Sequence, residues 1–254
     1  MADAGLRESR SGTVVSMRAS ANRLAIGIAA VLLLSSVPAH AEWIRREESI
    51  MGTRCAVELW SLDRAKGEAS ITAVFEEFRR VDRLMSTYKP ESELSRVNAG
   101  AARAPVRVSR ELYDLLATST EYSKLTRGAF DITYASVGHL YDYRAGVHPD
   151  DASIAKALPG VNWRHLQLLP KYTAVRFRRP GMRVDLGGIG KGHAVDRGIA
   201  VLRQRGVDRA MVNAGGDTRI IGDRFGRPWI VGVRDPNSVG PDDGGKVALR
   251  LPLT

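Results

Sequence analysis

Hydrophobic residues recur with helical spacing over two long stretches of the chain. Between about residues 64 and 86 they fall at i, i+3 and i+4, which places them on one face of a helix. This first stripe consists of Ile71, Val74, Phe75, Phe78, Val81, Leu84 and Met85, and Asp63 stands where an N-cap belongs. A second helix is predicted over about 109–125, capped by Ser109, with Leu112, Leu115, Leu116 and Tyr122 turned inward.

Alternation of apolar and polar residues predicts strands elsewhere. Residues 43–60 are predicted to form two strand pieces, because Cys55, Val57 and Leu59 alternate with polar or small neighbours. Met51-Gly52-Thr53 would be the bulge or turn between the two pieces. Further strands are predicted in a hairpin over Trp163–Phe177, at Ile220-Ile221, over Trp229–Val233 and over Val247–Leu251.

The stretch from Arg183 to Asp217 combines a short apolar run, a cluster of glycines and a helical pattern. The run ends at Asp185, and Gly187, Gly188, Gly190 and Gly192 follow before a helix that closes at Gly206. A strand, a glycine turn and a helix start can cradle a phosphate or another anion. The alternative is that these glycines serve only tight turns and close packing. A second glycine turn, over Asn213–Asp217, comes one helix later and can fold back beside the first.

Two well-known nucleotide-binding motifs do not fit this stretch. A P-loop requires G-x-x-x-x-G-K-[ST], but the position five before Gly190 is Asp185, and Lys191 is followed by Gly192. A dinucleotide fingerprint requires G-x-G-x-x-G, but after Gly188 and Gly190 the third glycine position is His193. A phosphate-bearing ligand would therefore be held in another way.

The composition is that of a globular protein with a sizeable core. The chain has 254 residues, of which 44% are hydrophobic and 26% charged. A net charge of +10 raises the question of nucleic-acid binding, but no Lys/Arg block exceeds a few residues and no set of stacking aromatics accompanies it. We therefore expect no nucleic acid as partner, and a preference for anionic ligands. Cys55 is the only cysteine, so the chain forms no internal disulfide.

The first 41 residues have the pattern of a secretory signal peptide. Arg18 and Arg23 precede an apolar segment over residues 24–37, and Ala39-His40-Ala41 is a small-residue cleavage motif. The apolar segment is too short for a comfortable membrane span. We expect cleavage after this motif, a periplasmic protein, and a single folded domain over residues 42–254.

A set of short motifs stands in a fixed order along residues 43–254. The motifs are Met51-Gly-Thr53, Leu84-Met-Ser-Thr-Tyr-Lys-Pro90 with Ser92-Glu-Leu-Ser-Arg96, Gly128-Ala-Phe-Asp-Ile-Thr133, Val184-Asp-Leu-Gly-Gly-Ile-Gly-Lys-Gly192 with Ala194-Val-Asp196, Val212-Asn-Ala-Gly-Gly-Asp217, and Pro228-Trp229 leading to Asp235-Pro236. Together they resemble the ApbE family, the FAD:protein FMN transferases of bacterial envelopes. The resemblance implies an α+β fold in which helices pack on a mainly antiparallel sheet, similar to the family's T-fold-like core.

The resemblance also implies a Mg²⁺-dependent enzyme that binds FAD, breaks its pyrophosphate, and transfers FMN to a Thr or Ser hydroxyl of a target flavoprotein, releasing AMP. Family FAD contacts carry over to Met51, Tyr88, Ala129, Phe130, Asp131, Asp185 and Lys191, and the Gly188 carbonyl resembles a family metal ligand. Tyr88 and Phe130 suit a flat ring. Asp131 and Asp185 can accept hydrogen bonds from ring N–H, ribose or adenine amine groups. Mg²⁺ prefers oxygen ligands and substrate phosphates.

Other polar residues near the glycine turn have ordinary interpretations. His193 is predicted to be a surface or supporting residue, and Asp196 to be a carboxylate that the helix macrodipole favours in the first turn.

Family members continue past the strand that matches Val247–Leu251, into segments that supply the candidate base and the side-chain metal ligands. This sequence stops at Thr254, so we expect a domain that is incomplete at its C-terminus and leave the catalytic residues unassigned. Three hypotheses stand: an active transferase, a catalytically silent flavin-binding protein, and an incomplete fragment. The expected partner is a target flavoprotein, with peripheral association with inner-membrane complexes as a further expectation.

Overall fold

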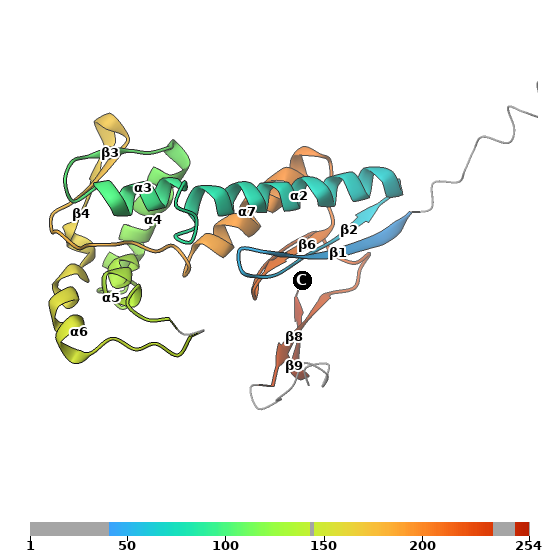
Figure 1. Ribbon diagram of the computed structural model, residues 1–254. Helices are drawn as coiled ribbons and strands as arrows, with labels where there is room; N and C mark the ends of the chain where they lie inside the picture. Colours follow the sequence, from blue (N-terminus) through green and yellow to red (C-terminus); the bar gives the residue numbers. More distant parts are fainter. Residues whose placement is uncertain (1–40, 143–144, 236–246, 254) are drawn as a thin grey trace, which may run out of the picture. The chain divides into compact units, whose positions relative to one another are not determined.

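Figure 1 shows a computed structural model of the chain, which describes residues 41–142, 145–235 and 247–253. Its strands are β1 (Glu42–Ile50), β2 (Thr53–Ser61), β3 (Val106–Arg107), β4 (Leu166–Leu169), β5 (Ala174–Phe177), β6 (Ala210–Ala214), β7 (Asp217–Ile221), β8 (Trp229–Arg234) and β9 (Val247–Leu253). Its helices are α2 (Arg64–Met85), α3 (Glu93–Gly100), α4 (Arg110–Leu125), α5 (Ala135–Gly138), α6 (Asp151–Ala157) and α7 (Gly190–Gln204). None of the helices within the described ranges is long and apolar enough to cross a membrane.

An antiparallel four-stranded sheet in the order β1-β2-β6-β7 carries the main core. Met51 and Gly52 close the β1–β2 hairpin, with Ile50 paired to Thr53. Both turn residues have positive φ (56° and 70°), the geometry of the tight hairpin turn that matches strand twist. The predicted turn at Met51-Gly52-Thr53 is confirmed.

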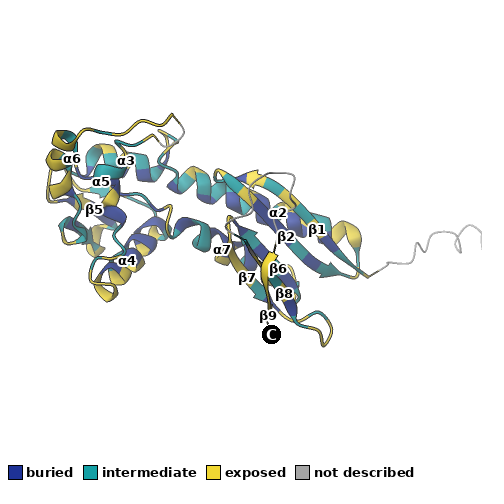
Figure 2. Cartoon of the chain, turned by 90° about the horizontal axis from the view of Figure 1, so that it is seen from below, coloured by how far each residue is buried: buried dark blue, intermediate teal, exposed yellow. Residues whose placement is uncertain are grey.

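Helices α2 and α7 pack side by side on one face of this sheet (Figure 1). Figure 2 shows the buried stretches along both helices and along the strands they face. The buried side chains of the two helices include Ile71, Phe75, Phe78, Val195 and Ile199. At the crossing, a Cβ on Gly198 would lie 2.9 Å from Val74 Cγ1, so the close approach requires glycine there. Two strands, a helix, an insertion, a helix and two strands give the α+β fold that the sequence predicted.

The insertion between α2 and α7 contains α3, α4, α5, α6 and a small sheet in the order β3-β5-β4. Helix α4 begins where the sequence predicted, and α3 has the same kind of cap. Ser92 Oγ accepts the Ser95 N–H at 3.0 Å, and Ser109 Oγ accepts the Leu112 N–H at 3.2 Å. The predicted hairpin over Trp163–Phe177 is also present, as β4 and β5.

The segment before the glycine turn, Arg183–Asp185, is not a strand, contrary to its apolar pattern. Side chains take the place of a neighbouring strand. Asn98 Nδ2 donates to the Val184 carbonyl at 2.9 Å, and Asn98 Oδ1 accepts the Val184 N–H at 2.8 Å. Ser136 Oγ accepts the Arg183 N–H at 3.0 Å. Val184 is fully buried, which explains the apolar run. Buried backbone N–H and C=O groups need hydrogen-bond partners, but a pattern of hydrophobicity does not show which groups provide them.

Strands β8 and β9 pair with each other, as a separate two-stranded sheet. Trp229, at the start of β8, is buried and packs edge-on against Trp43 of β1, with ring centroids 5.1 Å apart. Its Nε1 donates to the Gly222 carbonyl at 2.9 Å. The contact ties the start of β8 to the four-stranded sheet.

The Asp63→Ala substitution tests the N-cap of α2. The Asp63 carboxylate accepts the Lys66 N–H at 3.1 Å. Its loss is expected to lower the free energy of unfolding by about 1 kcal/mol, because an N-terminal backbone donor of α2 loses its partner. Urea denaturation measures the effect. Glu76→Ala, which removes an exposed carboxylate on the same helix, is the control, and an equal loss in both variants would contradict the capping role.

Candidate functional site

A cavity of about 560 Å³, here called cavity 1, opens beside the glycine turn that precedes α7. Four of the residues predicted to contact FAD line it: Met51, Tyr88, Asp185 and Lys191. They come from the β1–β2 turn, the segment after α2, the residues before the glycine turn and the first turn of α7. Tyr88 is 92% exposed, so its ring can cover a flat ligand that enters the cavity.

The Asp185 carboxylate is held in place by donors from separate parts of the chain. Its Oδ2 accepts from Thr87 Oγ1 at 2.8 Å, and its Oδ1 accepts from the Gly187 N–H at 2.7 Å and the Tyr134 hydroxyl at 3.2 Å. A Cβ on Gly187 would lie 2.9 Å from this Oδ1 atom, so a side chain there would displace the carboxylate. Asp185 therefore fixes the glycine turn to the end of α2.

The second glycine turn folds back beside the first, as the sequence allowed. The Gly215 N–H donates to the Arg54 carbonyl at 3.0 Å, and Gly215 has a φ of 60°. A Cβ on Gly215 would lie 2.7 Å from Thr53 Oγ1 and 3.1 Å from Lys191 Cδ. The β1–β2 turn, the β6–β7 turn and the start of α7 thus meet at one place.

Lys191 reaches across the first glycine turn, where its Nζ donates to the Gly187 carbonyl at 2.8 Å. It forms no ion pair with any residue that the structure describes, whereas Lys89, which also lines cavity 1, is paired with Asp82 at 2.6 Å. The Lys191 ammonium therefore supplies positive charge that an anionic ligand in cavity 1 can use.

A second cavity of about 640 Å³, cavity 2, contains the predicted residues Phe130 and Gly188. Phe130 Cε2 lies 3.3 Å from the place that a Cβ on Gly188 would occupy. The prediction that Tyr122 turns inward is wrong: it is 50% exposed and meets the Phe130 ring edge-on at 6.2 Å. Because Gly187 lines cavity 1 and Gly188 lines cavity 2, the glycine turn contributes to both.

Ala129 and Asp131 do not line either cavity. Ala129 is exposed. Asp131 Oδ1 accepts from the Thr133 N–H at 2.8 Å and the Thr133 hydroxyl at 2.6 Å, and Oδ2 accepts the Trp163 N–H at 2.9 Å. In the structure this carboxylate orders the segment after α4 beside Phe130, and its contact with FAD stays a prediction.

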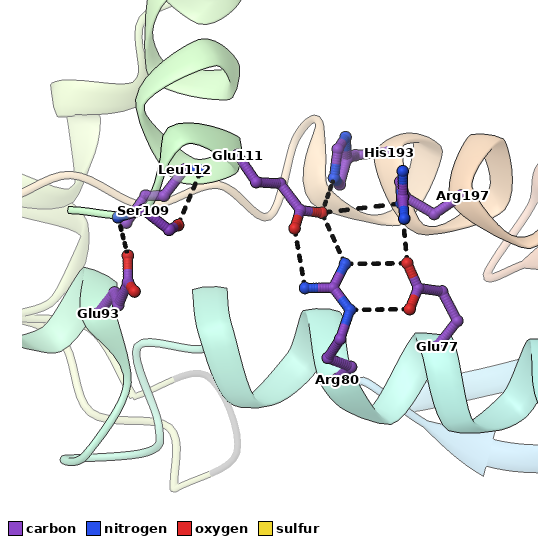
Figure 3. Close-up of polar contacts among 8 residues, drawn as sticks. All are labelled: Glu77, Arg80, Glu93, Ser109, Glu111, Leu112, His193 and Arg197. Atoms are coloured by element: carbon purple, nitrogen blue, oxygen red, sulfur yellow. Dashed lines mark hydrogen bonds and ion pairs between the residues drawn. The ribbon is translucent and has the colours of Figure 1, made fainter. Parts of the chain in front are cut away.

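A charge network joins α2, α4 and α7 next to cavity 2 (Figure 3). Arg80 donates to Glu77 at 2.7 Å through Nε and to Glu111 at 2.8 Å through Nη2. Arg197 Nε lies 2.8 Å from Glu77 Oε1, and His193 Nε2 lies 2.8 Å from Glu111 Oε1. Neither Glu111 nor its contact with His193 was predicted from the sequence. The three helices that carry these residues are far apart in the chain, so no local spacing of residues links them.

These contacts change the acidity of both glutamates. The hydrogen bonds from Arg80, supported by Arg197 and opposed by burial, lower the pKa of Glu77 from its ordinary 4.5 to about 2. Arg80 also lowers the pKa of Glu111, with a smaller contribution from His193. Both carboxylates are therefore ionised at neutral pH.

Most of the chain matches the profile of one known protein family. The sequence profile described as the ApbE family matches residues 51–253. The chain belongs to the ApbE family. Curated relatives named FAD:protein FMN transferase include a Treponema pallidum (strain Nichols) protein, 30% identical over 223 residues that cover 81% of this chain and 61% of that protein. Another, from Klebsiella pneumoniae (strain 342), is 31% identical over 191 residues, 74% of this chain and 57% of that protein. The chain spans about three fifths of these relatives' length.

Solved ApbE structures have the same fold. The ApbE protein of Thermotoga maritima superposes with a TM-score of 0.75 at 27% identity, covering 84% of this chain and 68% of that one. The flavin transferase ApbE of Vibrio cholerae gives a TM-score of 0.71 at 28% identity, covering 78% of this chain and 65% of that one. The α+β architecture with an antiparallel sheet is therefore that of the ApbE family.

Oxygen atoms near Gly188 are the candidate ligands for the Mg²⁺ ion that the resemblance to the ApbE family implies. The described part of the chain contains no group of three or more His, Cys, Asp or Glu side chains able to hold a metal. Cavity 2 brings Gly188 together with Asp196 and Asp217, and Asp196 is already ion-paired with Arg219. Mg²⁺ is commonly held by one or two carboxylates together with substrate phosphates and water. The residues present therefore fit an ion that a bound pyrophosphate helps to hold.

Proposed function

We propose that this chain binds FAD in cavity 1 and transfers FMN from it to a Thr or Ser hydroxyl of a target flavoprotein, with release of AMP. The observation that carries the proposal is the meeting of Met51, Tyr88, Asp185 and Lys191 around cavity 1, at the glycine turn. Membership of the ApbE family, in which the matched relatives are named FAD:protein FMN transferase, supports it.

The residues of cavity 1 suit the parts of FAD. Tyr88 would stack on a flat ring, Asp185 would accept a hydrogen bond from a ring N–H or a ribose hydroxyl, and Lys191 would attract a phosphate. In the transfer, the acceptor oxygen bonds to the phosphorus of the FMN part while the bond from that phosphorus to the oxygen of the AMP part breaks. The acceptor hydroxyl loses its proton, and AMP leaves.

Dependence on Mg²⁺ is part of the proposal. The Gly188 carbonyl and the Asp217 carboxylate are the candidates to hold the ion beside the pyrophosphate. When bound, Mg²⁺ would neutralise negative charge on the phosphate oxygens. Chelation with EDTA is expected to suppress transfer, and transfer that persists unchanged in EDTA would remove the metal from the proposal.

The direct test uses the chain, FAD, Mg²⁺ and the acceptor domain of a bacterial flavoprotein that carries FMN on threonine. Flavin fluorescence should remain with the acceptor on a denaturing gel, and AMP should appear in equal amount. Absence of FAD binding would overturn the proposal.

The second candidate is a flavin-binding protein without transferase activity. It is favoured by the absence, among the described residues, of a cluster of three or more metal-binding side chains. In the same assay this candidate predicts FAD binding with neither AMP release nor protein-linked fluorescence.

Location in the periplasm, with peripheral association with inner-membrane complexes, is also proposed. It rests on the signal-peptide pattern of residues 1–41, which lies almost wholly outside the described residues. Osmotic-shock fractionation and N-terminal sequencing of the expressed protein test it. A cytoplasmic protein with an intact N-terminus would contradict it.

The Lys191→Met substitution tests the cation of cavity 1. Methionine keeps an apolar chain beside Gly215 but removes the ammonium group. FAD binding is expected to weaken about tenfold, because a charge-assisted contact to phosphate contributes roughly 1.5–3 kcal/mol. Quenching of flavin fluorescence measures the affinity. Lys124→Met, at an exposed position of α4, is the control, and equal affinities of the two variants would contradict the role.

A further inference from the structure

Cavity 2 runs between one face of α4 and one face of α7. On α7 the cavity is lined by Gly192, His193, Val195 and Asp196, with the N-cap residue Ile189 just before the helix, and on α4 it is lined by Leu115, Thr118 and Tyr122. Nothing lies within 4 Å of the place that a Cβ on Gly192 would occupy, so the wall is open there. A volume of about 640 Å³ is within the range of ligand pockets, roughly 300–1,000 Å³.

His193 presents an oriented ring to this cavity. Its Nε2 faces Glu111 at 2.8 Å, and the other ring nitrogen points away from Glu111 (Figure 3). An ionised carboxylate only accepts hydrogen bonds, so Nε2 carries a hydrogen that it donates to Glu111, and in the tautomer with its hydrogen on Nε2 the acceptor of the ring is Nδ1. Among the residues that the structure describes, none is hydrogen-bonded to Nδ1, and the side chain is 20% exposed.

We propose that cavity 2 receives the hydroxyl-bearing segment of the acceptor protein, and that His193 Nδ1 accepts a hydrogen bond from the acceptor hydroxyl. The inference rests on the proposed function. The two cavities share the glycine turn, since Gly187 lines cavity 1 and Gly188 lines cavity 2. A hydroxyl in cavity 2 would therefore lie near the phosphates of an FAD molecule bound in cavity 1 beside this turn.

The charges of cavity 2 favour a polypeptide over a second phosphate group. Its cationic side chain, Arg219, is ion-paired with Asp196, and Asp217 adds negative charge. Thr118 supplies a hydroxyl that suits a backbone or a small polar side chain, whereas the Thr218 hydroxyl is already bonded to Asn213 and Gly216. Leu115 and Ile189 supply apolar contact, so the lining has the mixed character of a segment-binding groove.

Glu111 acts through His193 as a positioning residue. It is fixed in turn by Arg80, at 2.8 Å, so the orientation of the imidazole depends on the contact between α2 and α4. A histidine held in this way is pre-organised for an incoming hydroxyl, which lowers the ordering cost of binding.

The experiment compares His193→Phe with His193→Asn in the full chain. Phenylalanine keeps a ring but removes the acceptor atom, whereas asparagine can return an oxygen near the Nδ1 position. The probe is a fluorescently labelled acceptor domain whose FMN-bearing residue is threonine, with a Thr-to-Ala version of the same domain. Binding is measured by anisotropy without nucleotide, and FAD affinity is measured separately. His148→Phe, at an exposed histidine outside both cavities, is the control.

The expected result is that H193F binds the threonine domain about tenfold more weakly, that H193N recovers most of this loss, and that H148F does not change. The alanine domain should bind wild type and H193F equally, because the hydroxyl is missing. FAD affinity should stay the same in every variant.

Three results would overturn the inference: no binding of the acceptor domain to wild type, an H193F effect equal for both domains, or a parallel loss of FAD affinity. The first two leave the proposed function intact if FAD still binds and FMN is transferred. Failure of wild type to bind FAD would instead remove the proposed function, and the inference with it.

Discussion

The Asp185→Ala variant is expected to bind FAD about 100-fold more weakly than the wild-type protein. The carboxylate lines cavity 1 and accepts hydrogen bonds from Thr87, Tyr134 and the Gly187 N–H. Its removal deletes the ligand's hydrogen-bond acceptor and also releases the glycine turn from the end of α2. Hydrogen bonds to charged groups contribute roughly 1.5–3 kcal/mol, and 2.7 kcal/mol is about a factor of 100 in affinity. Titration with FAD, followed by flavin fluorescence, measures the change.

The matched comparison for this prediction is Asp131→Ala. Both aspartates were predicted from the sequence to contact FAD, but the Asp131 carboxylate is bound to Thr133 and Trp163 and lies outside both cavities. D131A should therefore lower the thermal stability while changing FAD affinity less than D185A does. An FAD affinity for D185A within twofold of wild type would contradict the role of cavity 1.

The parts of the fold that were predictable from the sequence are those decided by neighbouring residues. Asp63 and Ser109 each cap a helix whose apolar stripe begins a few residues later, and both caps are present. The turn at Met51-Gly52 lies between two alternating patterns and is also present. In each example the deciding interaction spans only a few residues, so a single sequence contains it.

The site was predictable only as a set of residues. Motif order predicted one set of FAD contacts, of which Met51, Tyr88, Asp185 and Lys191 line cavity 1, but it did not indicate that Phe130 lines cavity 2. The position of Phe130 in cavity 2 depends on how α4 lies against α7, and no local sequence pattern contains that information.

Polar contacts between residues far apart in the chain account for the remaining differences between the sequence predictions and the structure. The apolar run before Asp185 predicts a strand, yet Asn98 satisfies its backbone from 86 positions away. Glu111 and His193 are 82 positions apart, and neither stands in a motif that names the other. Hydrophobic periodicity records which face is buried, but it does not record which polar group meets which.

The Arg80→Ala substitution is expected to lower the free energy of unfolding by about 2 kcal/mol at neutral pH. Arg80 bridges Glu77 and Glu111, whose side chains are 11% and 25% exposed, and without it the two carboxylates keep, among the described residues, Arg197 and His193 as ion-pair partners. Loss of one partner of a buried ion pair costs roughly 3–5 kcal/mol, and the 38% exposure of Arg80 reduces that figure. Arg110→Ala, which removes a 79% exposed arginine paired with Asp114, is the control, and its loss of stability should be much smaller because solvent screens the exposed pair.

Acid titration separates this electrostatic effect from a simple loss of packing. The pKa of Glu77 is lowered to about 2 from 4.5, so its contribution to stability is complete above pH 4.5 and is lost as the pH falls toward 2. In R80A the pKa of Glu77 returns toward its ordinary value, because the largest cause of its shift is gone. The difference in stability between wild type and R80A should therefore shrink across this window, as measured by urea denaturation at successive pH values. A difference that stays constant from pH 7 to pH 2 would show that Arg80 stabilises the three helices through its aliphatic packing instead.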